Sequence, residues 1–79
     1  MNWRTLIERN PARLSGKPVF IGTRISVELV LERLAAGDTT DQLLEQYPTL
    51  RVEHIRAAFA FAAEQLSLTQ TVLLDEEAV

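Results

Sequence analysis

Hydrophobic positions recur at helical spacing in three separate stretches of the chain. The first stretch predicts a helix over about residues 27–36, because apolar side chains three and four positions apart share one helix face. Ser26 stands before it as a good N-cap, and Gly37 follows where a left-handed C-terminal residue belongs. The apolar stripe of this first helix comprises Val27, Val30, Leu31 and Leu34.

The second stretch predicts a short helix over about residues 40–47. Thr39 and Gln42 have the spacing of a capping box, in which each side chain accepts from the other residue's backbone. Asp41 favours the positive end of the helix dipole, and Pro48 stops the helix.

The third stretch predicts a longer helix, from near Val52 to about Leu66. Phe61 lies roughly 120° around that helix from Ile55, well off the apolar stripe, at 3.6 residues per turn. We therefore expect a cover for Phe61 from the N-terminal segment, the C-terminal tail or a second subunit. The predicted buried stripe comprises Ile55, Ala58, Phe59, Ala62 and Leu66.

A short extended element is predicted before the three helices. Gly16 and Gly22 permit sharp turns at the two ends of the apolar run 19–21, and the chain then enters the first helix. A strand this short needs a partner strand, either from residues 6–8 or from another subunit. Residues 3–8 are compatible with a short strand or with a helical turn.

Together these elements predict a mainly α fold in a single domain. With 79 residues, of which 47% are hydrophobic, the chain is long enough for one small packed core. A short middle helix followed by a longer third helix is the outline of a helix-turn-helix bundle, here preceded by a β element. We place the domain at residues 1–66 and a C-terminal tail at residues 67–79.

Catalytic and metal-binding patterns are missing from the sequence. There is no cysteine, and the single histidine, His54, has no nucleophile or acid partner in sequence, so we expect it to cap the third helix or face solvent. The sequence predicts a non-enzymatic protein without a cofactor. No apolar run approaches the length of a membrane span, and we expect a cytoplasmic protein.

Charge is distributed unevenly along the chain. Residues 1–24 hold five basic residues against Glu8 alone, whereas residues 25–79 hold three basic residues against ten acids. Such asymmetry is typical of an arm that binds nucleic acid, of two halves that meet across an oligomer interface, or of an ordinary solvated surface. The candidate DNA-binding residues are Arg4, Arg9, Arg13, Lys17, Arg24, Arg51 and Arg56.

The third helix is a weak candidate for reading DNA bases. Its exposed start offers Arg56 and Arg51, but Glu53 and Glu64 offset their charge. If the protein binds duplex DNA, we expect the basic N-terminal arm to contribute at least as much as this helix.

Several segments carry a family resemblance. Gly16-Lys17-Pro18 through Gly22-Thr23-Arg24, continuing in 34–37, 43–44, 47–50 and 54–62, resembles family 433 of the domains of unknown function. The resemblance implies a homeodomain-like three-helix fold after a short β element, and an antitoxin-like role beside a PIN-like nuclease toxin in bacteria. The chain departs from the family at Arg51, where Ser or Thr is usual, and at His54, where an acid is usual.

These observations lead to the hypothesis of an antitoxin that dimerises and neutralises a PIN-like nuclease, with operator DNA as a further partner. An apolar triplet followed by three acids in the tail suits a basic nuclease cleft. The alternative is a structural dimerisation module, or a DNA-binding regulator without a toxin partner. The candidate partner-binding residues of the tail are Val72, Leu73, Leu74, Asp75, Glu76 and Glu77.

Overall fold

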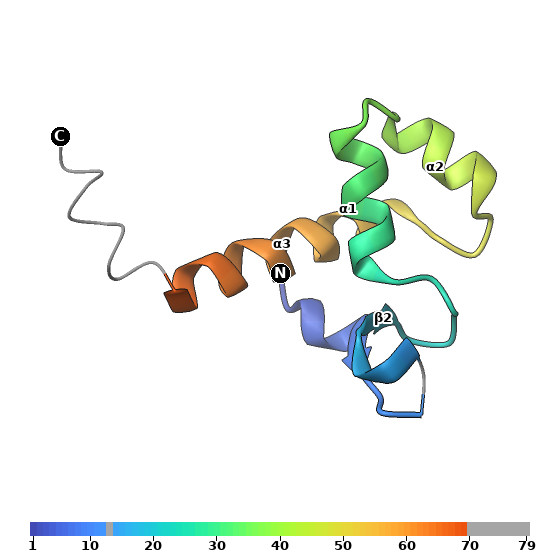
Figure 1. The fold of residues 1–79 in the computed structure, drawn as a ribbon. Coiled ribbons are helices and arrows are strands. Elements are labelled where there is room, and N and C mark those ends of the chain that lie inside the picture. The colour runs from blue at the N-terminus through green and yellow to red at the C-terminus, as the bar shows by residue number, and fades with distance from the viewer. Residues whose placement is uncertain (13, 70–79) are drawn as a thin grey trace, which may run out of the picture.

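Three helices follow a two-stranded antiparallel sheet (Figure 1). The computed structural model describes residues 1–12 and 14–69. The mainly α fold with a preceding β element is therefore confirmed, and it is compatible with a helix-turn-helix arrangement. The elements are η1 (Trp3–Thr5, one 3₁₀ turn), β1 (Ile7–Arg9), η2 (Leu14–Gly16), β2 (Pro18–Phe20), α1 (Val27–Ala35), α2 (Thr40–Gln46) and α3 (Val52–Thr69).

Local capping chemistry sets the ends of α1 and α2, as predicted. The Ser26 hydroxyl accepts from the Leu29 backbone N–H at 3.0 Å, and Gly37 has a φ of 108° after α1. Thr39 and Gln42 form both bonds of the capping box, at 3.1 and 2.8 Å. These contacts satisfy N–H groups that would otherwise be left without a partner in the first turn.

His54 supports the start of α3. Its Nδ1 accepts from the Arg51 backbone N–H at 2.9 Å, and its ring lies edge-on to Phe20 at 5.3 Å between centroids. Of the two expectations for His54, that it caps the helix or faces solvent, the structure shows the cap. The imidazole thus replaces the Glu or Gln side chain that accepts this bond in a capping box. Helix α3 begins at Val52, as predicted.

The N-terminal residues supply the partner strand. Strand β1 pairs antiparallel with β2, with Ile7 opposite Phe20, Glu8 opposite Val19 and Arg9 opposite Pro18. The observed β2 starts and ends one residue before the predicted run, and Ile21 is exposed. Residues 3–8 hold both of the alternatives, a helical turn at η1 and the beginning of the strand.

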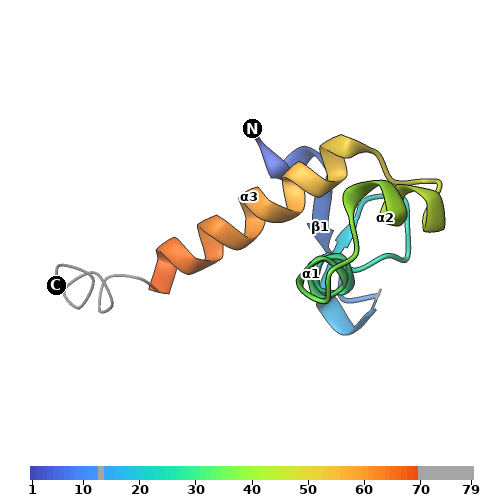
Figure 2. The same cartoon turned by 90° about the horizontal axis from the view of Figure 1, so that it is seen from above.

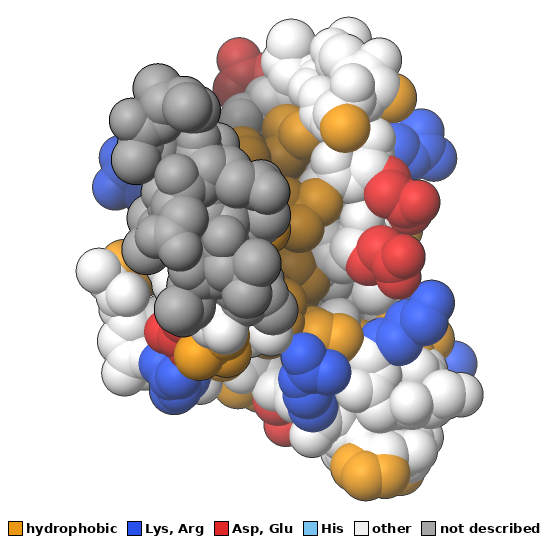
Figure 3. All heavy atoms as spheres, turned by 60° about the vertical axis from the view of Figure 1, so that its left-hand side comes forward, with side chains coloured by type: hydrophobic (Ala, Val, Ile, Leu, Met, Phe, Trp, Pro, Cys, Tyr) orange, Lys and Arg blue, Asp and Glu red, His pale blue; other side chains and the backbone are white. Residues whose placement is uncertain are grey.

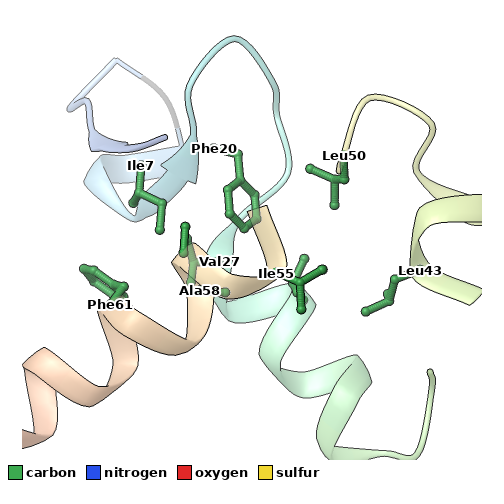
Figure 4. Packing of buried hydrophobic residues seen from close by; sticks show 10 residues of the cluster. Ile7, Phe20, Val27, Leu43, Leu50, Ile55, Ala58 and Phe61 are labelled. Carbon is green, nitrogen blue, oxygen red and sulfur yellow. The ribbon is translucent and has the colours of Figure 1, made fainter. Parts of the chain in front are cut away.

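The hydrophobic core lies where the first half of α3 meets β2, α1 and α2 (Figure 4). Phe20 and Leu43 are the largest side chains that are fully buried. From α3 the core receives Ile55 and two alanines, whose small size allows the neighbouring elements to approach closely. Its buried members are Ile7, Phe20, Val27, Val30, Leu43, Leu50, Ile55, Ala57, Ala58 and Phe61.

The predicted buried stripe of α3 is wrong at two positions. Phe59 is 53% exposed and Leu66 is 65% exposed, whereas Phe61 is only 8% exposed. Phe61 is covered by the N-terminal segment, one of the three covers that the sequence left open. The Trp3 ring meets it edge-on at 4.8 Å, and the Arg9 guanidinium lies 5.8 Å from its ring centroid. The turn at η1 therefore decides which side of α3 is buried.

Helix α3 is longer than predicted and continues to Thr69. Figures 1 and 2 show the end of α3, beyond its contacts with η1, extending away from the other described elements. None of the helices in the described parts of the chain has the length and apolar character needed to cross a membrane.

Candidate partner-binding groove

An apolar groove of about 330 Å³ lies between α1 and α3. Figure 3 shows a band of hydrophobic side chains on this face, with acidic side chains along one border. The walls come from the start of β2, one side of α1 and the Phe61 ring. The lining residues are Pro18, Val27, Glu28, Leu31, Glu32, Ala35 and Phe61.

Helical spacing builds the α1 side of this groove. Val27, Leu31 and Ala35 are four residues apart and therefore form one row along the helix. Glu28 and Glu32 form a parallel row about 100° further around, which makes them the acidic rim. One helix thus provides both an apolar wall and a charged border.

Charges of both signs border the groove, because Lys17 lies beside Glu28 and Arg9 lies over the Phe61 ring on the opposite wall. Lys17 Nζ lies 3.2 Å from Glu28 Oε1, but both side chains are more than half exposed, so solvent weakens this pair. Within residues 1–12 and 14–69, Glu32 forms no ion pair. An apolar ligand segment that carries basic flanking residues would match these walls and this rim.

A second ion pair fastens η1 to α3. Arg4 donates to the two Glu64 carboxylate oxygens at 2.6 and 3.4 Å, and the Trp3 indole N–H donates at 3.3 Å. The hydrogen bonds from Arg4, aided by the one from Trp3, hold the pKa of Glu64 below its ordinary value of 4.5, while partial desolvation opposes them. This contact keeps Trp3 over Phe61.

These two ion pairs join the basic residues 1–24 to the acidic residues 25–79 inside one chain. Charge asymmetry and the position of Phe61 were two reasons for predicting a homodimer. Basic and acidic residues pair within one chain, and Trp3 of the same chain covers Phe61. Neither feature therefore requires a second copy, and the dimer stays a prediction that needs another structural basis.

The described candidate DNA-binding residues have different surroundings. Arg4 and Lys17 are held in ion pairs, and Arg9 lies over Phe61. Arg51 and Arg56 are exposed near the start of α3. Arg24 borders a broader hollow of about 580 Å³, which is also lined by Ala12, Leu14, Gly22 and Thr23. Arg13 lies outside the described residues.

The predicted tail site, Val72, Leu73, Leu74, Asp75, Glu76 and Glu77, also lies outside the described residues. The groove itself was missed, because its α1 and α3 walls come from two helices whose crossing the sequence does not specify. The available signal was the second row of α1, Leu31 and Ala35 beside Glu28 and Glu32. In the part of the chain that the structure describes, no cluster of three or more His, Asp or Glu side chains could hold a metal ion.

The fold defines a small three-helix protein with an N-terminal β-hairpin. The chain belongs to the family DUF433, described as "Protein of unknown function", whose model matches residues 7–62. It is also 39% identical over 59 residues to "Uncharacterized protein y4eO" of Sinorhizobium fredii (strain NBRC 101917 / NGR234). That match covers 75% of this chain and 27% of the relative, so the chain spans about a quarter of the relative's length. No solved structure matches the chain.

Proposed function

We propose that this chain is a non-enzymatic binding protein, the antitoxin of a type II pair, that docks a PIN-like nuclease on the groove between α1 and α3. The observation that carries the proposal is the groove itself, with apolar walls and two acids, Glu28 and Glu32, along its α1 border. The antitoxin role is supported by the resemblance to the family and is otherwise an inference.

The chemistry of the groove favours a partner with an apolar anchor among basic residues. Burial of one large apolar side chain contributes about 1.5–3 kcal/mol, enough to anchor a protein contact. Glu28 and Glu32 would attract the positive surface that a nuclease needs for its nucleic-acid substrate. The acids of the tail would add to the same attraction.

Ala35 and Ala36 provide a matched pair of variants to test this site. Both alanines are exposed, but only Ala35 lines the groove. Ala35→Arg places a bulky cation among the walls, and we expect it to weaken binding by about 10-fold or more, which corresponds to 1.4 kcal/mol. Ala36→Arg makes the same change just outside the groove, and we expect binding within about twofold of the original.

The measurement is titration calorimetry with the PIN-like nuclease encoded beside this chain's gene, together with rescue of growth. Equal binding by Ala35→Arg and Ala36→Arg would contradict the groove as the docking site. Loss of binding on truncation after Thr69, with Ala35→Arg unaffected, would place the site in the tail. No binding of any variant would favour the alternative, a structural dimerisation module.

Operator DNA is a second candidate partner, favoured by the exposed start of α3. Neither Arg51 nor Arg56 forms an ion pair with any residue of 1–12 or 14–69, whereas the charge of Arg4 is offset by Glu64 beside it. With duplex DNA at fixed salt, we therefore expect Arg51/Arg56→Ala to lose more affinity than Arg4/Arg9/Arg13→Ala. The opposite order would favour the N-terminal arm, as the charge distribution of the sequence suggests.

A further inference from the structure

Helix α3 carries a second apolar stripe that the core does not use. Its large members are Val52, Phe59 and Leu66, whose side chains are 45%, 53% and 65% exposed. They stand seven residues apart, so each lies about 20° from the one before on a straight α-helix. The stripe therefore runs along one side of α3 for about 21 Å, nearly the whole helix.

This stripe and the groove lie on opposite sides of α3. Two residues advance a helix by about 200°, so Phe59 is about 160° from Phe61 around the axis. Beside the stripe stand Ala62 and Ala63, whose small side chains would let another helix approach closely. Seven-residue spacing of apolar side chains is the pattern by which helices pair side by side.

We propose that the Val52–Phe59–Leu66 stripe pairs with the same stripe of a second copy of this chain, with the two α3 helices antiparallel and Phe59 meeting Phe59 of the second copy. Val52 of each copy then meets Leu66 of the other. This assembly goes beyond the proposed function and does not depend on it, because the groove stays open on the far side of each helix.

Charge complementarity selects a second copy in the antiparallel direction. Arg51 and Arg56 lie near the start of α3 and leave it net positive despite Glu53 between them, and no Lys or Arg occurs from residue 57 to residue 79. On the described part of α3 beyond Arg56 the only charged side chain is Glu64, which pairs with Arg4 of the same chain. A parallel pair would bring the arginines of both copies together at one end.

An antiparallel pair instead places each basic helix start beside the second copy's helix end. That end carries the negative side of the helix dipole, which attracts Arg51 and Arg56 of the other copy. The two dipoles are also opposed, which is favourable. One arrangement therefore buries the stripe and keeps the arginines of the two copies at opposite ends.

Cysteine cross-linking tests the direction, because the chain has no cysteine of its own. In the full chain, Phe59→Cys should form a covalent dimer on mild oxidation, since its two copies meet at the symmetry axis. Val52→Cys and Leu66→Cys should not cross-link alone, but a mixture of the two should give the mixed dimer. Self-linking of all three variants would show a parallel pair and overturn the proposal.

Sedimentation equilibrium tests the surface. Phe59→Glu should weaken the dimer by about 30-fold or more, the effect of losing an interface residue worth at least 2 kcal/mol. Leu68→Glu is the matched control, because Leu68 is 72% exposed on the same helix but about 160° around from Leu66. It should leave the dimer unchanged. A monomer at tens of micromolar in the unaltered protein, or equal effects of the two variants, would overturn the proposal.

Discussion

Phe59 and Phe61 are two residues apart on one helix and have opposite environments. Phe61 is buried beneath Trp3 and Arg9, whereas Phe59 is more than half exposed. Phe59 belongs to the stripe that the sequence predicts as buried and Phe61 lies off it, so the stripe alone does not determine burial. The difference lies in the neighbours, because η1 is fastened over Phe61 by the contacts of Arg4 and Trp3 with Glu64. We infer that the Phe61 side of α3 stabilises the fold, whereas the Phe59 side is the one proposed to pair with a second copy of the chain.

Replacing Phe61 should have the largest effect on the free energy of unfolding. Phe61→Ala should lower the free energy of unfolding by about 3 kcal/mol, because it removes a buried ring and leaves a cavity. Phe59→Ala should change it by less than about 0.5 kcal/mol in dilute, monomeric protein, as for other exposed positions. Urea unfolding followed by circular dichroism at low micromolar concentration measures both. Similar losses would contradict the assigned roles of the two rings.

Removing Trp3, which covers Phe61, should have an intermediate effect on the free energy of unfolding. Trp3→Ala deletes the edge-on contact with Phe61 and exposes that ring to water, and we expect a loss of about 1–2 kcal/mol. Ile21→Ala is a control at another partly exposed apolar residue and should have a smaller effect. The same urea titration measures both, and equal losses would show that η1 does not stabilise the buried side of α3.

The smallest effect on stability is expected at Glu64, where it should depend on pH. Folding lowers the pKa of Glu64, so its ionised form contributes stability above the ordinary pKa of 4.5. That contribution is lost as the pH falls below 4.5 and through the lowered pKa of the folded state. Glu64→Gln should therefore be slightly less stable than the unaltered protein at pH 7, and the difference should shrink at pH 3.

Thermal unfolding at both pH values measures this difference. Glu53→Gln is the matched control, because Glu53 is exposed on the same helix and forms no ion pair within the described residues. A difference for Glu64→Gln that persists unchanged at pH 3 would show that the contact with Arg4 does not depend on the carboxylate charge.

The predictable parts of the fold are those that local chemistry determines. Ser26, the Thr39–Gln42 capping box and Gly37 act within a few residues of themselves, and the predicted ends of α1 and α2 agree with the structure to within one residue. The unpredictable part was which apolar row of α3 would be buried. That choice depends on a contact between Trp3 and Phe61, 58 positions apart in the chain. The groove depends in the same way on the crossing of α1 and α3.

Melting temperature as a function of protein concentration tests most directly whether the two sides of α3 have separate roles. A dimer of folded chains stabilises the fold by mass action, so the melting temperature of the unaltered protein should rise with concentration. Phe59→Ala should remove this rise and keep the melting temperature of dilute protein, whereas Phe61→Ala should lower the melting temperature at every concentration. A melting temperature of the unaltered protein that does not vary with concentration, or a rise that survives Phe59→Ala, would contradict the account.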